Sequence, residues 1–331
     1  MQMLVLPPVI LIAVIDALTC NTQSGAYAYT PEVKDVLHNL SLTNHACHRW
    51  STSILYNRVT VAGDQIAQLA VTLSGATPRA QSLSKRIQSL RILVADYTQR
   101  SDPMGGDKII DDALYLLRIL APTLSLQRLF VDTNVVDGFL EKNPDLHSAI
   151  SCLTSLAELT LINQQNRHAD FFWDMELCSR TYDCLSGLRA LTVGDVTINE
   201  SRTIAFLLPL VHLKELVLIR PWINRRYTEV GSILSGLFAP QRALQHLTLV
   251  LVNGWLGWAV ESLTVEDLGP EMIPHLDKVD TFSERDAESS RSWRDIGNMI
   301  GMGHRRSRRT RGGATMDDGH VTQLLKARGD N

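Results

Sequence analysis

The sequence predicts an α/β fold, in which a short helical module precedes an irregular solenoid of strand–helix repeats. Three observations support this. Apolar residues recur at helical spacing near the N-terminus, and one leucine spacing recurs through the middle. Apolar periodicity then fades, and Asp, Glu, Ser and Arg become frequent. We therefore expect a helical module at 1–62, repeats at 63–276 and a mostly disordered tail at 277–331.

The composition indicates a globular chain in a reducing compartment. The 331 residues are 45% hydrophobic and carry a net charge of -3, so no strong overall field attracts nucleic acid or acidic membranes. The five cysteines are scattered and contain no C-x-x-C pair. We expect a cytoplasmic or nuclear location.

The first 18 residues are strongly apolar and permit two readings. In one, Pro7 or Pro8 begins an amphipathic helix, since proline suits the first helical turn. In the other, the stretch is a signal peptide and the protein is secreted. The helix is favoured because no Lys or Arg precedes the apolar run and Asp16 interrupts its end.

The next elements are two helices and a strand. Thr30-Pro31-Glu32 combines a cap, a first-turn proline and an acidic residue, which predicts a helix start. A further helical segment follows over 42–55, and residues 58–61 resemble a strand.

One spacing, L-x-x-L-x-L, recurs in a constant register and predicts the strands of the solenoid. In three copies a further leucine lies three residues before the first leucine of the copy, at positions 153, 185 and 210. A weaker copy includes Leu90 and Leu93, and a doubtful one closes the series at Val260, Leu263 and Val265. The clear copies are Leu126, Leu129, Val131; Leu156, Leu159, Leu161; Leu188, Leu191, Val193; Leu213, Leu216, Leu218; and Leu244, Leu247, Leu249.

Helix-like segments lie between the copies, over 111–120, 143–153, 200–210 and 228–238. Alternating strands and helices of this kind are typical of a leucine-rich repeat solenoid, in which each unit buries its leucines against its neighbours.

The remaining strand positions are expected to point outward onto a concave face, because side chains alternate along a strand. Their mixed polar and apolar character favours a protein substrate; we expect no nucleic-acid, membrane or small-molecule partner and no cofactor. The candidate substrate-binding residues are Arg128, Phe130, Glu158, Thr160, Thr192, Glu215, Val217, His246 and Thr248.

The N-terminal module resembles the F-box family with leucine-rich repeats, particularly the divergent F-box-like proteins abundant in mushroom-forming fungi. Residues 6–18, which begin Leu-Pro-Pro, are similar to the opening of the box. Residues 41–46, Ser-Leu-Thr-Asn-His-Ala, resemble its later helix, and residues 55–61 resemble the strand that leads into the repeats.

This resemblance implies the substrate-receptor subunit of a cullin–RING ubiquitin ligase. The box would dock on a Skp-type linker, and the repeats would hold a substrate. For Leu11, Ile15 and Leu42, packing within the module is an equally good reading. The residues implied in docking are Leu6, Pro7, Pro8, Ile10, Leu11, Ile15 and Leu42.

Two departures from the family pattern support an alternative. Val9 replaces an acidic residue, and Cys47 takes the place of the usual Trp, with Trp50 nearly one turn later. The alternative is a leucine-rich repeat scaffold whose box no longer binds a linker.

The other motifs do not predict catalysis. His45-Ala-Cys47-His48 lacks a second ligand pair, so we expect a core cysteine flanked by surface histidines rather than a metal site. Residues 104–108, Met-Gly-Gly-Asp-Lys, lack P-loop spacing and are expected to form a solvated loop. No G-x-S-x-G or H-E-x-x-H motif occurs, so no enzyme is predicted. The basic cluster 304–311 has no assigned role, and the substrate, exact repeat number and oligomeric state stay open.

Overall fold

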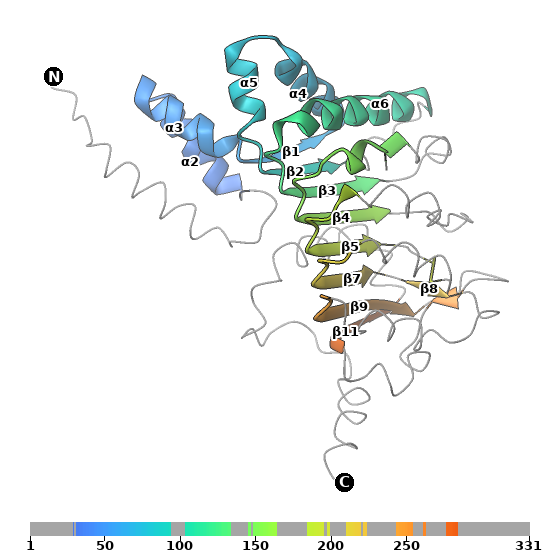
Figure 1. The fold of residues 1–331 in the computed structure, drawn as a ribbon. Helices are drawn as coiled ribbons and strands as arrows, with labels where there is room; N and C mark the ends of the chain where they lie inside the picture. The colour runs from blue at the N-terminus through green and yellow to red at the C-terminus, as the bar shows by residue number, and fades with distance from the viewer. Residues whose placement is uncertain are drawn as a thin grey trace, which may run out of the picture.

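The fold is an α/β stack in which parallel strands follow one another in chain order, with the longer described helices grouped at its N-terminal end (Figure 1). The computed structural model describes residues 29, 31–93, 103–133, 145–146, 148–163, 184–194, 197–198, 210–219, 221–223, 243–253, 261–262 and 276–283.

Two short helices come first and pack against each other. Helix α2 (Pro31–Ser41) begins at the predicted proline and carries Glu32 in its first turn. Helix α3 (His45–Leu55) is capped by Asn44, whose side chain accepts a 2.9 Å hydrogen bond from the amide of Cys47. Both predicted helices are confirmed.

The first strand unit follows directly. Strand β1 (Arg58–Ala62) confirms the predicted strand, and it pairs in parallel with β2 (Ser89–Leu93). Between them lie α4 (Asp64–Ser74) and α5 (Pro78–Ser84). Gly63 has a φ of 52°, a conformation that glycine adopts without the usual side-chain penalty, and this turn begins α4.

Helix α6 (Pro103–Leu120) covers the early strands and runs into a short 3₁₀ turn, η1 (Ala121–Thr123). The expectation of a loop at 104–108 was wrong, because this segment is the first part of α6. Pro103 supplies a favourable first-turn residue, and the long apolar face that follows stabilises a helix that two glycines would otherwise weaken.

The main sheet contains eight strands in the order β1-β2-β3-β4-β5-β7-β9-β11, and every neighbouring pair is parallel. The five clear leucine copies coincide with the five strands that follow β2, as predicted. These are β3 (Arg128–Thr133), β4 (Glu158–Asn163), β5 (Ala190–Gly194), β7 (Glu215–Ile219) and β9 (His246–Asn253).

The last strand, β11 (Leu276–Ser283), pairs with β9. Most of this strand lies within 277–331, the segment expected to be mostly disordered, so its first residues are regular structure. A register shift between Leu276 and Lys278 breaks the leucine spacing, which is why the pattern failed to reveal this strand.

A second, small sheet lies beside the strand ends and has the order β10-β8-β6. It contains β6 (Thr197–Ile198), β8 (Trp222–Ile223) and β10 (Glu261–Ser262). The doubtful copy at Val260, Leu263 and Val265 lies outside the described residues, although the intervening Glu261 and Ser262 belong to this small sheet.

The register of β2 also corrects the first repeat copy. Leu90 pairs with Leu129 and Ile92 pairs with Val131, so the core positions are Ile87, Leu90 and Ile92. Leu93 instead pairs with Asp132 and lies on the other face of the sheet.

Successive turns enter their strands through one repeated hydrogen-bond pattern. The carbonyl of Asn57 accepts from the amides of Gln88 and Ser89, at 3.1 and 3.0 Å. The carbonyl of Gln88 accepts from the next turn in the same way, and the pattern continues through Gln127, Ala157, Arg189 and Lys214. Since Asn57 begins the series, β1 is the first strand of the same solenoid-like stack.

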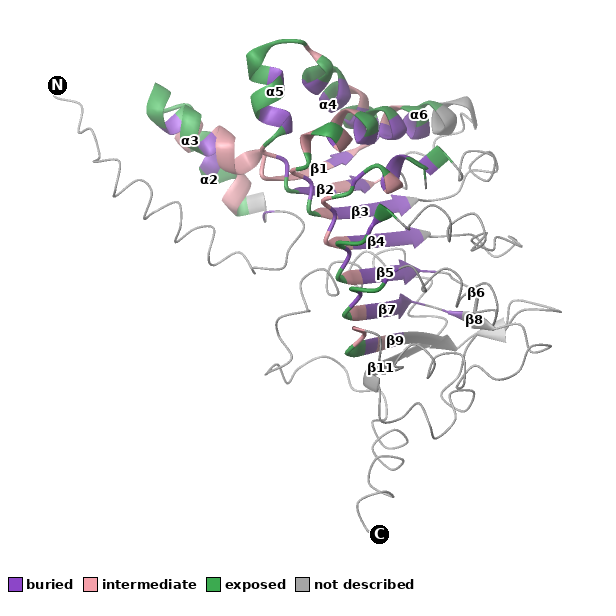
Figure 2. Ribbon diagram, in the orientation of Figure 1, coloured by how far each residue is buried: buried purple, intermediate pink, exposed green. Residues whose placement is uncertain are grey.

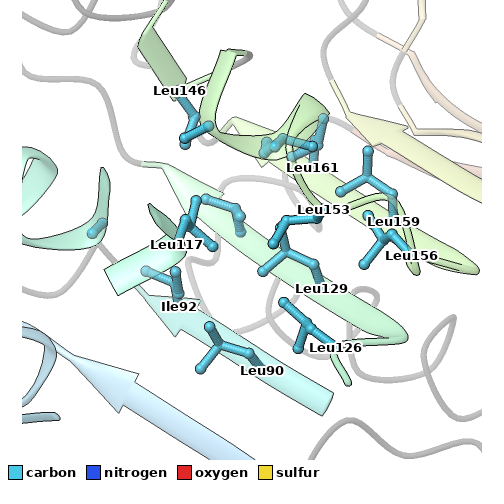
Figure 3. Packing of buried hydrophobic residues seen from close by; sticks show 14 of the residues in the cluster. Leu90, Ile92, Leu117, Leu126, Leu129, Leu146, Leu153, Leu156, Leu159 and Leu161 are labelled. Atoms are coloured by element: carbon cyan, nitrogen blue, oxygen red, sulfur yellow. The ribbon is translucent and has the colours of Figure 1, made fainter. Parts of the chain in front are cut away.

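The leucines of the repeats form one continuous core on one side of the sheet (Figures 2 and 3). The preceding leucines make the bend before each strand: the amide of Leu156 donates to the carbonyl of Leu153 at 2.9 Å, and Leu188 donates likewise to Leu185. Burying one leucine side chain contributes about 1.5–3 kcal/mol. Side chains at 1% exposure or less include Leu126, Leu129, Leu156, Leu159, Leu188 and Leu191.

The predicted helix over 111–120 is confirmed within α6, and 145–146 and 148–151 are helical as expected for 143–153. The helix-like segments 200–209 and 228–238 lie outside the described residues.

Candidate functional site

Two surfaces can carry function: the sheet face opposite the leucine core, called here the opposite face, and the helical pair α2–α3. The opposite face has two aligned rows across the strands, fixed by the parallel register. The first row is Arg58, Ser89, Arg128, Glu158, Ala190, Glu215 and His246. The central row is Thr60, Arg91, Phe130, Thr160, Thr192, Val217 and Thr248.

The register brings together the predicted substrate-binding residues, but most of the central row is buried. Phe130 is 2% exposed, Thr160 and Thr192 are 4% exposed, and Val217 is 1% exposed. The expectation that these side chains face solvent was wrong. Each of these residues lies on a strand that has a paired neighbour on both sides.

The first row is the accessible one. The side chain of Glu158 is 42% exposed, and His246 is exposed at the far end of the row. The Nε atom of Arg128 donates a 2.6 Å hydrogen bond to Oε2 of Glu158, which holds both side chains along the row. A partner that approaches this face would therefore meet Arg128, Glu158, Glu215 and His246 first.

The N-terminal end of the opposite face is basic, and the sequence analysis missed this feature. Arg58 of β1 and Arg91 of β2 lie on the same face as Arg128. The copy based on Leu90 and Leu93 concealed Arg91. These two leucines lie on opposite faces of β2, so they gave the wrong face for the residues between them. The correct copy begins at Ile87. Ile87, Leu90 and Ile92 occupy the three apolar positions of the L-x-x-L-x-L spacing, which places Arg91 on the opposite face.

Aromatic rings hold two of these arginines. The guanidinium carbon of Arg91 lies 4.5 Å from the ring centroid of Phe130, and that of Arg58 lies 5.1 Å from the ring centroid of Tyr29. Both arrangements are cation–π contacts. Burial raises the pKa of the Tyr29 hydroxyl, and the Arg58 charge partly opposes this. Tyr29 therefore fixes the chain entering α2 to the basic end of the sheet.

A buried carboxyl lies beside this basic end. Asp132 is 1% exposed, and its register partners on the adjacent strands are Leu93 and Ile162. Burial raises its pKa from 3.8 to about 7, although the Arg91 charge acts in the opposite direction. Near neutral pH this carboxyl therefore neutralises the neighbouring cations only in part.

The helical pair presents apolar side chains to solvent. Leu42 is 72% exposed, Trp50 is 43% exposed and Val36 is 39% exposed. Of the two readings kept for Leu42, packing inside the module does not hold. Cys47 is buried against Leu40 and Ile54, so it fills the inner side of α3. Figure 2 shows the exposed faces of these helices.

The other predicted docking residues, Leu6, Pro7, Pro8, Ile10, Leu11 and Ile15, lie outside the described residues. His45 and His48 are exposed on either side of Cys47, which is the arrangement predicted for a core cysteine flanked by surface histidines. Within the described part of the chain, no group of three or more His, Cys, Asp and Glu side chains is placed to hold a metal ion.

Comparison with known proteins adds distant likeness to solved structures. No protein-family model matches the sequence, and no curated protein matches it. Among solved structures, the chain is similar to the crystal structure of a TLR13–ssRNA13 complex, at 21% identity and a TM-score of 0.32. The match covers 61% of this chain and 28% of that one.

None of the helices that the structure describes is long and apolar enough to span a bilayer. The fold is α/β, and its parallel sheet with covering helices is consistent with a leucine-rich-repeat-like solenoid.

Proposed function

We propose that this chain is a substrate-receptor subunit of a cullin–RING ubiquitin ligase. In this proposal the F-box-like helices bind a Skp-type linker, and the accessible row of the sheet binds a protein substrate. The resemblance of the N-terminal module to F-box sequences supplies the identity of the linker. The structure contributes a specific observation about where the linker would bind.

That observation is the exposure of Val36 on α2, of Trp50 on α3 and of Leu42 in the turn between these two packed helices. Each helix has one side against its partner, where Cys47, Leu40 and Ile54 form a small core. Exposed large apolar side chains on a small module are typical of a surface that a partner covers. Leu42, which the F-box resemblance assigns to docking, is the most exposed of the three.

The proposal is tested by a pull-down of the full-length chain with a fungal Skp-type linker. The wild type is compared with a Leu42→Asp, Trp50→Asp double variant. Val71→Asp on α4 is the matched control, because Val71 is 71% exposed and lies outside the helical pair. We expect the double variant to lose at least tenfold in linker affinity, since two charges replace the apolar contacts. The control should bind like the wild type.

A Leu6→Asp, Leu11→Asp variant extends the test to the opening of the box. Equal binding by the wild type and both double variants would contradict docking through these residues.

A second candidate function is a repeat scaffold that no longer binds a linker. It is favoured by Cys47, which fills the core of α3 where the family usually has Trp. A folded wild-type chain that fails to capture the linker would reject the ligase proposal and leave the scaffold.

A further inference from the structure

Two free cysteines occupy the same position in consecutive turns of the stack. Cys152 and Cys184 each directly precede a buried leucine, and each lies seven residues before a strand leucine. Those strand leucines, Leu159 of β4 and Leu191 of β5, are register partners in the sheet. Both cysteine side chains are exposed, so their thiols are accessible to solvent.

The backbone after each cysteine follows the same course. The amide of Leu156 donates to the carbonyl of Leu153 at 2.9 Å, and the amide of Leu188 donates to the carbonyl of Leu185 at the same distance. Matched hydrogen bonds and matched burial therefore make the two cysteines equivalent residues of their turns.

The two turns also lie against each other. The carbonyl of Ala157 accepts hydrogen bonds from the amides of Arg189 and Ala190, at 2.8 and 3.1 Å. A Cβ atom at Gly187 would lie 3.6 Å from the carbonyl oxygen of Leu156 and 3.8 Å from that of Thr154, which is van der Waals contact. Since Thr154 and Gly187 follow the cysteines by two and three residues, the close stacking reaches almost to the thiols.

This stacking suits a disulfide bond. Paired strands lie about 4.8 Å apart, and a disulfide joins residues whose Cα atoms are about 4.4–6.8 Å apart. Equivalent residues in turns that stack with the strand spacing fall within that range. Sγ of Cys152 donates a 3.3 Å hydrogen bond to the carbonyl of Ser148, and a change of side-chain rotamer frees this sulfur without moving the buried leucine beside it.

We propose that Cys152 and Cys184 form a redox-active dithiol, which closes a reversible disulfide between the turns that lead into β4 and β5. The oxidant is a small-molecule disulfide such as oxidised glutathione. The thiolate of one cysteine attacks this disulfide, which forms a mixed disulfide and releases one glutathione thiolate. The thiolate of the other cysteine then attacks the protein-bound sulfur and releases the second glutathione. Two electrons and two protons thus pass from the protein thiols to the two glutathione thiols.

The bond would fasten the centre of the accessible row. The bridged turns lead into β4 and β5, which contribute Glu158 and Ala190 to that row. A cross-link between residues 152 and 184 also restricts the unfolded chain, so oxidation should stabilise the stack. In a reducing compartment such a disulfide is transient, which is the behaviour of a redox sensor.

The test incubates the full-length chain with oxidised glutathione at pH 8, because the thiolate is the reactive form. Free thiols are then alkylated, and tryptic peptides are mapped by mass spectrometry. Trypsin separates the relevant cysteines: Cys152 lies in peptide 143–167, Cys178 in 168–180 and Cys184 in 181–189. We expect 143–167 linked to 181–189 in most molecules of the monomeric protein, and dithiothreitol should reverse the link.

Thermal unfolding gives a second readout. Oxidation should raise the Tm of the wild type by at least about 4 °C. Cys152→Ser and Cys184→Ser should each abolish both the link and the Tm shift. A Cys20→Ser, Cys178→Ser double variant is the matched control, because it removes two other thiols and should keep both effects.

Unreacted thiols at Cys152 and Cys184, or separate glutathione adducts on them, would overturn the dithiol. A link from Cys178 to either residue, or a link confined to covalent dimers, would contradict it equally. A linked peptide that leaves the Tm unchanged would refute the claim that the bond fastens two turns. Neither a Skp-type linker nor a substrate takes part in this reaction, so its failure would leave the proposed function untouched.

Discussion

At the residue scale, Asp132 makes the stability of the protein depend on pH. Its pKa in the folded state is about 7, above the ordinary value of 3.8, because burial disfavours the carboxylate. The folded chain therefore holds a proton at pH 5 that the unfolded chain has lost. The protonated Asp132 carboxyl stabilises the folded state fully below about pH 4, and this stabilisation is lost as the pH rises through about 7.

Replacing Asp132 with Asn should remove this dependence. Between pH 5 and pH 8 the wild type should lose on the order of 2 kcal/mol relative to Asp132→Asn, given 1.36 kcal/mol for each pKa unit. Urea unfolding of both proteins at the two pH values measures the difference, and contributions from other groups cancel in the comparison. Parallel stability changes in the two proteins would contradict a buried, high-pKa carboxyl.

Leu124 is a second residue whose environment makes a prediction. It follows η1 with a φ of 54°, in the left-handed region, and its side chain is 63% exposed. A leucine there pays a steric penalty without burying much surface. Leu124→Gly should therefore raise the free energy of unfolding by about 0.5–1 kcal/mol. Leu124→Ala, which retains a Cβ, should leave it nearly unchanged; a destabilised glycine variant would show that the leucine makes important contacts.

At the element scale, each strand is stabilised by leucines that contact the units before and after it. Leu159 of β4 is 1% exposed and belongs to the continuous core. Leu159→Ala should lower the free energy of unfolding by about 2–5 kcal/mol, because the cavity cannot close between fixed strands. Chemical denaturation gives the value.

The controls for this substitution separate packing from local preference. Leu159→Met, which keeps the volume, should cost less than about 1.5 kcal/mol. Val71→Ala at an exposed position of α4 should change stability by no more than about 0.5 kcal/mol. A loss below 1 kcal/mol for Leu159→Ala would contradict a close-packed repeat core.

Leucine spacing predicted the strands from β3 to β9 well, since burial of alternate side chains imposes that spacing directly on the sequence. The same signal failed where geometry changed. A register shift concealed β11, and the first copy was placed three residues too late in β2, so Arg91 was not expected on the opposite face. The start of α6 was missed because the adjacent glycines at 105 and 106 are typical of a loop. The apolar residues that follow them at helical spacing would have indicated a helix.

At the scale of the whole molecule, the candidate site was only partly predictable. Side-chain alternation correctly placed Arg128, Glu158 and His246 on one face. Burial of Phe130 and Thr160 was not predictable in this way, because alternation gives the face on which a side chain lies and not how far that face is covered. The cation–π contact between Tyr29 and Arg58 joins residues from separate elements, and no sequence spacing encodes it.

In the proposed function, the helical pair and the sheet would bind different partners. The helical pair with exposed Leu42 and Trp50 would bind the linker, and the sheet would hold the substrate. Since the exposed apolar residues of the pair and the accessible row of the sheet involve different side chains, the two activities should be separable by mutation.

The most direct test of the central claim is calorimetric titration of the purified full-length chain with a Skp-type linker. The account predicts a one-to-one complex that the Leu42→Asp, Trp50→Asp variant does not form and that Val71→Asp forms normally. Absence of binding by folded wild-type protein, or unchanged binding by the double variant, would contradict it.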